Sequence, residues 1–136
     1  MKPGPRKKVL IVDDSRIVRE RLAALISELP TVEVIGDAAN VVEAVKKIRR
    51  LRPHIVVLDI AMPGGNGIHV LEAIRKLRPP RAHIIMLTNF AQEAYRERCL
   101  ELGAEYFFDK SAEFQEAVET IKELSRSTSL PRLVRT

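Results

Sequence analysis

Residues 9–15 read VLIVDDS, so four consecutive apolar residues run directly into two aspartates. A short, continuously apolar run is typical of a strand that is buried on both faces, as in a parallel sheet. Residues 55–58 and 84–87 form two further runs of this kind. Residues 32–36 alternate more, as an edge strand does, and residues 106–108 form the shortest run. Together these runs predict five strands.

Segments with apolar residues at helical spacing lie between these runs and after the last one. The second of them begins at Asn40, which forms a capping-box pair with Glu43. The fourth covers about residues 91–102, with Gly103 placed to end it in a left-handed turn, and the last is expected to open at Ser111. The alternation predicts an α/β fold, a doubly wound five-stranded parallel sheet with helices on both faces.

The composition is that of one soluble globular domain, because 46% of the 136 residues are hydrophobic and 30% are charged. No apolar run approaches the ~20 residues that span a bilayer, so we expect no membrane insertion. Cys99 is the single cysteine, which excludes an intramolecular disulfide and suits a cytoplasmic protein. We expect no second catalytic or DNA-binding domain in a chain of this length.

The net charge of +5 arises at the two ends of the chain. Residues 9–125 carry sixteen Lys and Arg against all 18 Asp and Glu, which leaves this part slightly acidic. We expect basic tails at 1–6 and 126–136 around one domain at 7–125. The tails either touch nucleic acid or an anionic membrane, or are solvated ends, and the lack of interleaved aromatic residues favours the solvated ends.

Other conspicuous residues have structural interpretations. The basic clusters within 46–52 and 75–78 fall at the carboxyl ends of predicted helices, where they complement the helix dipole. The three histidines match no metal-ligand spacing. Cys99 is expected to be a buried or inert thiol, and Tyr95 to share the inner face of its helix.

In open parallel sheets the functional site forms at the carboxyl ends of the strands. The residues that follow the predicted strands there are Asp13, Asp14, Asp59, Thr88, Asp109 and Lys110. Taken singly, each has a structural explanation; Asp14 or Ser15, for example, can cap the first helix. Taken together, they predict a polar site built from distant parts of the chain.

The chemistry of that site follows from its charges. Two carboxylates about 5 Å apart repel by ~3 kcal/mol at an effective dielectric constant near 20, so three of them hold a proton or recruit a cation. Hard oxygen ligands with room for water suit Mg²⁺. A metal facing a carboxylate nucleophile, with Lys110 and the Thr88 hydroxyl nearby, is the equipment for phosphoryl transfer to aspartate. Because no Walker-type glycine-rich loop is present, we expect another protein to supply the phosphoryl group.

At these residues the chain resembles the receiver domain of two-component response regulators, in the stand-alone form of the chemotaxis regulators. The resemblance covers about residues 7–125, and the matching stretches are VLIVDDS (9–15), LDIAMP (58–63) with Gly67, Leu87 with Thr88, and Gly103 with Ala104, Phe107 and Lys110. It implies a flavodoxin-like fold with strand order 2-1-3-4-5.

The resemblance also implies a role for each site residue. Asp59 would be the phosphorylated residue, receiving its phosphoryl group from a sensor histidine kinase or a histidine phosphotransfer protein. Mg²⁺ would be bound directly by Asp14, Asp59 and the backbone carbonyl of Ala61, and by Asp13 through water. Lys110 would pair with the phosphoryl oxygens.

Thr88 and Phe107 would form a switch that changes a protein-binding surface on the fourth and fifth helices. The expected output is binding of a downstream protein target or transfer of the phosphoryl group onward in a relay, and a homodimer through that face is compatible with the family. Phe107 can instead be a plain core aromatic. The protein would not be an enzyme, apart from assisting its own phosphorylation and dephosphorylation.

Three positions depart from the family pattern. Ser111 follows Lys110 where many members have proline, so a trans peptide bond is expected there. Asn89 stands where a small residue is usual and crowds the pocket. Ala61 and Phe90 occupy the two variable positions that tune phosphoryl lifetime, and neither can position a water molecule, so an unusually short lifetime is not expected.

Two other classes of function remain open. One is a docking module that never takes a phosphoryl group, against which the intact acidic set, Thr88 and Lys110 argue. The other is a regulator that contacts nucleic acid through its basic tails. Nothing like a recognition helix follows Ser125, which argues against this second class.

Overall fold

Five strands form one parallel sheet in the computed structural model, which describes residues 5–126. They are β1 (Lys7–Val12), β2 (Val32–Ala38), β3 (Ile55–Leu58), β6 (His83–Thr88) and β7 (Tyr106–Asp109). The order across the sheet is β2-β1-β3-β6-β7. Counted along the chain, this is the order 2-1-3-4-5, so the predicted fold is confirmed.

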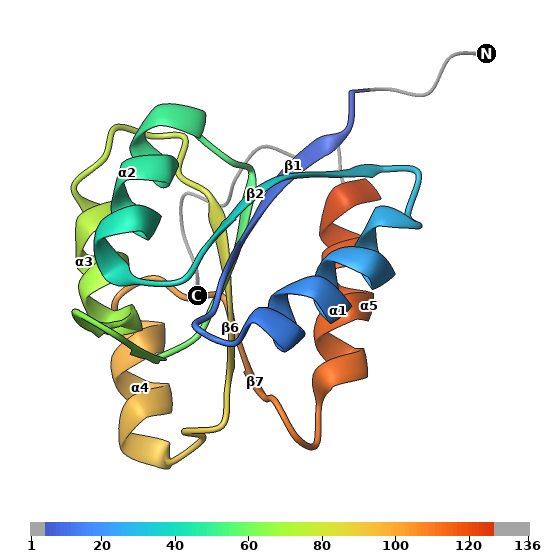
Figure 1. Ribbon diagram of the computed structural model, residues 1–136. Helices are drawn as coiled ribbons and strands as arrows, with labels where there is room; N and C mark the ends of the chain where they lie inside the picture. The colour runs from blue at the N-terminus through green and yellow to red at the C-terminus, as the bar shows by residue number, and fades with distance from the viewer. Residues whose placement is uncertain (1–4, 127–136) are drawn as a thin grey trace.

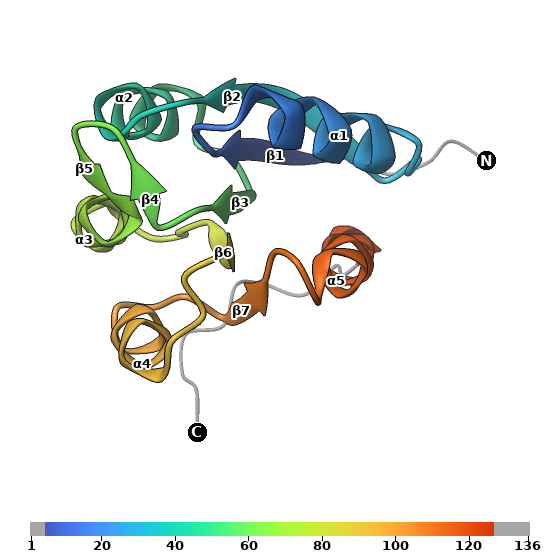
Figure 2. The ribbon, with the colours of Figure 1, turned by 60° about the horizontal axis from the view of Figure 1, so that its bottom comes forward.

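Helices cover both faces of the sheet (Figures 1 and 2). On one face lie α1 (Arg16–Ser27) and α5 (Phe114–Arg126). On the other lie α2 (Val41–Leu51), α3 (Gly67–Arg75) and α4 (Glu93–Glu101). The view of Figure 2 separates the two groups clearly, with the sheet between them. Because all strands run parallel, their carboxyl ends meet at one edge of the sheet, which we call the carboxyl edge, and their amino ends meet at the opposite amino edge.

The sheet is buried on both faces, as the continuous apolar runs predict. Val9 and Ile11 of β1 pack into the core under α1 and α5. Leu10 and Val12 pack into the separate core under α2, α3 and α4. Since successive side chains of a strand point to opposite faces, one apolar run supplies both cores.

Two helix boundaries follow the sequence prediction. The Asn40 side chain accepts a hydrogen bond from the Glu43 N–H (2.8 Å) and so caps α2. The Glu43 carboxylate reaches back to the N–H of Ala39 (3.0 Å), one residue before the cap. Gly103 has φ of +105°, the left-handed conformation expected after the fourth helix.

Two helix details differ from the prediction. α5 begins at Phe114 rather than at Ser111, because the Asp109 carboxylate accepts hydrogen bonds from both the N–H and the hydroxyl of Ser111 and holds it in a turn. Tyr95 does not share the inner face of α4: its exposed fraction is 38%, whereas Cys99 is fully buried.

A two-stranded hairpin, β4 (Ala61–Met62) with β5 (Gly65–Asn66), follows β3 and was not predicted. The edge strand β2 also carries a bulge. Val9 pairs with Val34 but Leu10 pairs with Gly36, so Ile35 is an extra residue without a partner on β1.

The predicted tails at 1–6 and 126–136 lie almost entirely outside the described residues. Within residues 5–126, no helix combines the length and the apolar composition that spanning a bilayer requires.

Candidate functional site

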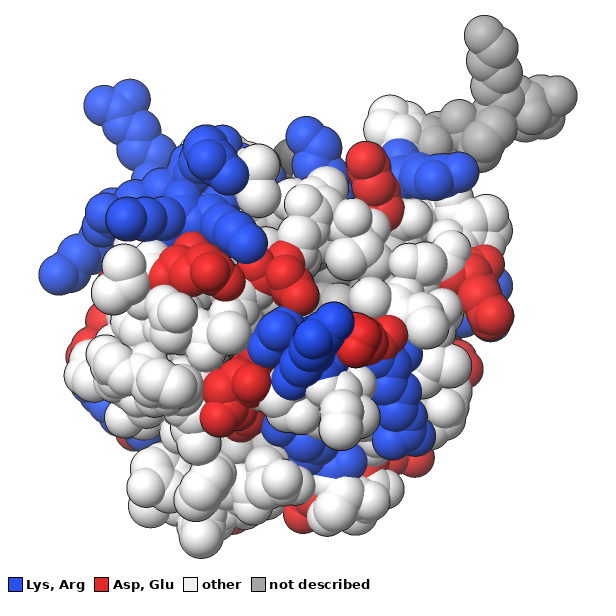
Figure 3. Space-filling model, in the orientation of Figure 1, with Lys and Arg blue, Asp and Glu red and all other residues white. Residues whose placement is uncertain are grey.

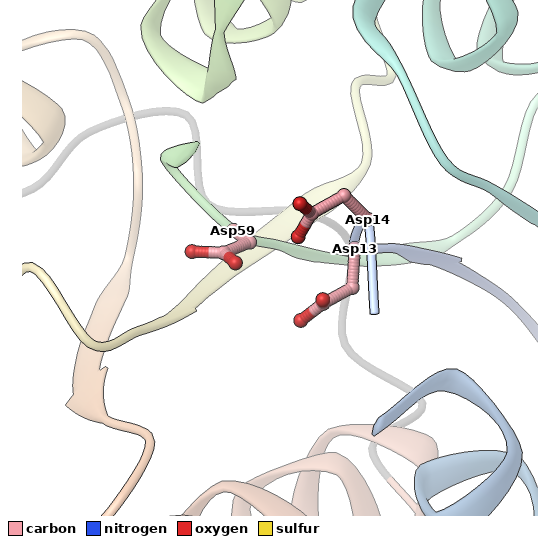
Figure 4. A group of neighbouring side chains, drawn as sticks. All are labelled: Asp13, Asp14 and Asp59. Atoms are coloured by element: carbon pink, nitrogen blue, oxygen red, sulfur yellow. The ribbon is translucent and has the colours of Figure 1, made fainter. Parts of the chain in front are cut away.

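Three carboxylates meet at the carboxyl edge (Figure 4). Asp13 and Asp14 directly follow β1, and Asp59 directly follows β3; the two strands are neighbours, with Val12 paired to Leu58. One oxygen of each carboxylate lies within 4.8 Å of the others. Asp13 and Asp59 are buried and Asp14 is exposed, so the group opens to solvent on one side.

Lys110 connects two of these carboxylates. Its Nζ lies 2.7 Å from Oδ2 of Asp13 and 2.9 Å from Oδ2 of Asp59. Lys110 follows β7, which is the outermost strand on the side of the sheet away from β2. Only 12% of its side chain is exposed. The ammonium is therefore a buried bridge between residues that are far apart in the sequence.

Backbone N–H groups hold the second oxygen of each of these two carboxylates. Oδ1 of Asp59 accepts a hydrogen bond from the N–H of Ile60 (2.7 Å), and Oδ1 of Asp13 accepts one from the N–H of Ser15 (2.8 Å). The Ser15 hydroxyl in turn caps α1 by accepting from the N–H of Val18 (3.3 Å). The helix cap is thus Ser15 and not Asp14, which leaves the Asp14 carboxylate in the acidic group.

The charges in this group are not balanced. Burial raises the pKa of Asp13, and the hydrogen bonds from Lys110 and Ser15 offset this only in part. Burial on its own lowers the pKa of Lys110, but the hydrogen bonds to Asp13 and Asp59 outweigh it, so that pKa is raised and the ammonium stays charged. One cation facing three acids leaves a net negative site, which favours a further cation.

The donor set fits Mg²⁺. All three side chains offer hard oxygen atoms, and the exposed side of the group at Asp14 leaves room for water, which Mg²⁺ usually retains. Ala61 lies in β4, two residues after Asp59. Among residues 5–126, these three aspartates are the one group of three or more acidic, His or Cys side chains close enough together to hold a metal ion.

Gly67 packs against the backbone of Asp59, a contact that the sequence motif alone does not reveal. A Cβ atom at Gly67 would lie 2.2 Å from the backbone carbonyl oxygen of Asp59. The N–H of Gly67 also donates to the carbonyl of Ile60 (2.7 Å). The start of α3 therefore packs directly against the backbone that carries Asp59, and only glycine allows this approach.

Arg19 is a second residue that sequence reasoning missed. Its Nη1 donates to the backbone carbonyl of Asp13 (2.8 Å), and its Nε donates to Oδ2 of Asp37 (2.9 Å). The Arg19 side chain is 16% exposed. It ties the loop of Asp13 to the end of β2, and no local pattern indicates this contact because Asp37 is distant in the sequence.

The predicted switch residues lie on the neighbouring strands β6 and β7, and neither has a hydrogen bond to the acidic group. Thr88 ends β6 and is fully buried. Its hydroxyl accepts a hydrogen bond from the N–H of Phe90 (3.1 Å), and its carbonyl accepts one from the N–H of Lys110 (2.8 Å). Phe107 is buried in the core under α2, α3 and α4, with the guanidinium of Arg96 5.7 Å from its ring centre.

The structure also places Ser111, Asn89 and Phe90, which depart from the family pattern or stand at its variable positions. The Lys110–Ser111 peptide bond is trans, as expected, since Pro79–Pro80 is the one cis bond among the described residues. Asn89 and Phe90 are both exposed after β6.

The histidines and the cysteine stay outside this site. The three histidines are separately engaged: His54 accepts from the Lys8 N–H, His69 from the Asn66 N–H, and His83 lies 2.6 Å from a Glu105 carboxylate oxygen. Burial raises the pKa of Cys99 to about 11, so this thiol is inert at neutral pH.

Comparison with known proteins places this geometry in a family. The family described as "Response regulator receiver domain" matches residues 9–122. The chain is 30% identical to the DNA-binding transcriptional activator DevR/DosR of Mycobacterium tuberculosis over 90% of its own length and 56% of the relative's. It is 51% identical to an uncharacterized response regulatory protein of Vibrio cholerae over 43% of its length and 25% of that protein. The chain thus spans about half or less of these curated relatives.

Solved structures show the same fold. The response regulator domain of Thermotoga maritima CheB has a TM-score of 0.78 and 32% identity, covering 91% of this chain and 99% of that one. The Borrelia burgdorferi CheX-CheY-BeF3-Mg complex gives a TM-score of 0.76 at 32% identity, covering 87% and 90%. Family match, sheet order and structural neighbours agree, and the chain belongs to the response regulator receiver domains of two-component systems.

Proposed function

We propose that Asp59 is the phosphorylated residue of this receiver domain. The observation that carries the proposal is the Lys110 ammonium, which bridges the buried carboxylates of Asp59 and Asp13 in the acidic group. Such an ammonium is already placed to neutralise the oxygens of an incoming phosphoryl group. The donor is a phosphohistidine of a sensor histidine kinase or of a histidine phosphotransfer protein.

In the proposed step, a carboxylate oxygen of Asp59 forms a bond to phosphorus and the phosphorus–nitrogen bond of the donor histidine breaks. The imidazole leaves with the electron pair of that bond. Both carboxylate oxygens of Asp59 accept hydrogen bonds, one from the N–H of Ile60 and one from the ammonium of Lys110. The carboxylate is therefore fixed in orientation before the donor arrives. As the transfer proceeds, Lys110 exchanges its contact with the carboxylate for one with a phosphoryl oxygen.

We propose that Asp14, Asp59 and the carbonyl of Ala61 hold Mg²⁺ directly and that Asp13 holds it through water. A bound Mg²⁺ supplies positive charge that neutralises the carboxylates and the phosphoryl oxygens. The Borrelia burgdorferi complex contains a related receiver together with BeF3 and Mg²⁺, which supports a magnesium site here. The proposed reaction belongs in the cytoplasm, and buried, reduced Cys99 is compatible with that compartment.

The proposed output is a change in the surface of α4 and α5. A phosphoryl group on Asp59 adds about two negative charges and three acceptor oxygens. The Thr88 hydroxyl would turn from the N–H of Phe90 to donate to one of them. The Phe107 side chain already occupies a buried position. Phosphorylation would favour this position over an outward one and so shift the population between two conformations of the α4 and α5 surface. A downstream protein target would read the shift, or a second copy of the chain would bind the same face.

Exposure to acetyl phosphate and Mg²⁺, followed by mass spectrometry of the intact chain, tests the proposal. The parent protein should gain one phosphoryl group, and Asp59→Asn should gain none. Glu33→Gln is the matched control, because it makes the same carboxylate-to-amide change at an exposed residue of β2 outside the acidic group, and it should be phosphorylated like the parent. A full adduct on Asp59→Asn would place the nucleophile elsewhere. An unmodified parent would favour the docking module.

Thr88→Ala and Phe107→Ala test the switch after phosphorylation. Thr88→Ala should still accept the phosphoryl group, but its NMR shifts in α4 and α5 should change much less than those of the parent. If both variants respond as fully as the parent, the signal runs through other residues.

A further inference from the structure

A basic surface lies at the amino edge of the sheet, opposite the acidic group. We call it the basic edge and define it by six exposed side chains at the ends of α2 and α3 and in the loops that follow them: Arg49, Arg50, Arg52, Lys76, Arg78 and Arg81. Figure 3 shows Lys and Arg gathered at the upper left, where Figure 1 places the carboxyl end of α2 and the loop after α3.

Contacts between the two loops bring these residues together. Nη2 of Arg52 donates to the carbonyl of Arg78 (2.7 Å) and also reaches that of Pro80 (3.3 Å). Arg52 and Arg81 line the same small hollow beside Leu77. The basic edge is therefore one continuous surface held by the fold, and not two separate helix ends.

The positive charge of the basic edge is not compensated. No Asp or Glu occurs at residues 44–58 or 73–92, the stretches that contain all six cations. Across residues 5–126, no ion pair involves any of the six. Elsewhere on the surface, by contrast, Arg16 pairs with Glu20 and Arg98 pairs with Glu72 and Glu101.

Helix dipoles account for only part of this surface. Arg49 and Arg50 stand in the last turn of α2, where a cation is stabilised by the helix terminus. Arg78 lies three residues beyond the end of α3 at Arg75, outside the reach of a dipole effect that fades within the last turn. Arg81 donates from Nε to the carbonyl of Leu77 (2.9 Å), just after that helix end, but its side chain remains exposed. These contacts to carbonyl groups do not neutralise the cations, and like charges held together without acidic partners indicate an anionic partner.

We propose that the basic edge binds the phosphodiester backbone of duplex DNA without sequence preference. Five of its six cations are arginines, whose planar forks suit phosphate oxygens. Backbone binding needs no recognition helix in a groove, because the contacts are made to phosphates and not to base edges. The site lies at the opposite edge from Asp59, so one molecule can be phosphorylated and bound to DNA at once.

The composition of the basic edge disfavours other anionic partners. All six aromatic residues of the chain lie elsewhere, so the surface has no platform for stacking single-stranded bases and no aromatic anchor of the kind that protein interfaces use. The exposed large apolar side chains also lie elsewhere in the described chain, at Ile17, Val42, Phe90, Tyr95 and Leu100. None of these is placed to insert into a membrane surface beside the basic edge.

Fluorescence anisotropy of the full chain with a duplex of about 25 base pairs tests the proposal at several salt concentrations between about 50 and 200 mM. Arg49→Gln/Arg78→Gln should bind about tenfold more weakly at the lowest salt. It should also reduce the slope of log K against log salt by about 2, or about 0.9 for each lost phosphate contact. Arg16→Gln/Arg98→Gln removes the same net charge away from the basic edge, and its binding and slope should stay close to those of the parent.

Three results would overturn the proposal. The first is a parent protein that does not bind the duplex at the lowest salt. The second is an equal loss in both double variants, which would assign binding to overall charge or to the tails. The third is tighter binding of single-stranded DNA, polyglutamate or phosphatidylserine vesicles than of the duplex. Since all four substituted arginines are exposed, both variants should unfold at the same melting temperature as the parent, which confirms that they are folded.

Discussion

The two edges of the sheet use charge in opposite ways. At the carboxyl edge, the buried carboxylates of Asp13 and Asp59 are in direct contact with the largely buried ammonium of Lys110. At the amino edge, Arg49 and Arg78 are exposed and neither takes part in an ion pair within the described chain. The fold depends on the charges at the carboxyl edge, because a buried charge that loses its partner is strongly destabilising. The charges at the amino edge remain in water, so the fold tolerates their loss.

Lys110→Met should give the largest effect and provides the sharpest contrast between the edges. It keeps the apolar stem but leaves Asp13 and Asp59 buried without their cation, which should lower the free energy of unfolding by about 3 kcal/mol. Arg78→Met, at the amino edge, should change it by less than ~0.5 kcal/mol. Urea unfolding without Mg²⁺ measures both. Equal losses would mean that the buried pairing does not matter for stability.

Gly67→Ala tests how tightly the backbone is packed at the carboxyl edge. The new methyl group would meet the Asp59 carbonyl oxygen, and relieving that collision should cost about 2 kcal/mol. Gly36→Ala is the control, because its Cβ would lie 3.6 Å from a Leu10 side-chain atom, an ordinary contact. Thermal unfolding of both variants should show a loss only for Gly67→Ala; a tolerated alanine at 67 would show that the α3 start can move away from Asp59.

Mg²⁺ should stabilise the protein through the carboxyl edge alone. At ten times the dissociation constant, a single site adds about 1.4 kcal/mol to the free energy of unfolding. Asp14→Ala should lose this response, EDTA should reverse it in the parent, and Arg50→Ala at the amino edge should keep it. A melting temperature that does not change up to tens of millimolar Mg²⁺ would refute the metal assignment.

Arg19→Ala should have a smaller effect, because this side chain supports the carboxyl edge from outside the acidic group. It removes the hydrogen bonds to the Asp13 carbonyl and to Asp37, at a cost of about 1 kcal/mol. Chemical denaturation checks the value. Arg21→Ala removes an arginine of the same helix that stacks on Phe114 instead, and it should leave Mg²⁺ binding unchanged, whereas Arg19→Ala should weaken it. Unchanged Mg²⁺ affinity in Arg19→Ala would limit Arg19 to a structural role.

The smallest expected effect is a pH dependence at the amino edge. Burial, followed by the charges of Lys7 and Lys8, lowers the pKa of His54 below the ordinary value of 6.5. The unfolded chain then binds a proton more readily than the folded one, so this contribution to stability is complete above about pH 6.5 and declines as the pH falls below it. His54→Gln should unfold with a weaker pH dependence in this window, measured against the parent. An identical profile would show that His54 contributes nothing to it.

The sequence predicted the elements whose signal is local. The apolar run of β1 and the aspartates that follow it are contiguous, so strand and site were found together. The boundary at Asn40 was predicted because its capping partner lies three residues away. Strand order came from the resemblance, and the structure confirms it.

What sequence reasoning missed depends on contacts between distant residues or on competition for one group. Arg19 gave no signal because Asp37 approaches it only in the folded sheet. The start of α5 was wrong because Asp109 captures Ser111. The β4–β5 hairpin has strands of two residues, too short for any periodicity. The roles of Asp59, Thr88 and Phe107 stay predictions, tested by the experiments above.

The bulge at Ile35 has a consequence for how molecules of this protein meet in concentrated solution. β2 is the longest strand of the sheet and its outer side has no neighbour among the described strands, which is the usual template for aggregation. A strand from another molecule that tried to extend the sheet there would meet a break in register at Ile35 and the exposed carboxylates of Glu33 and Asp37. An irregular, charged border of this kind opposes edge-to-edge growth into fibres.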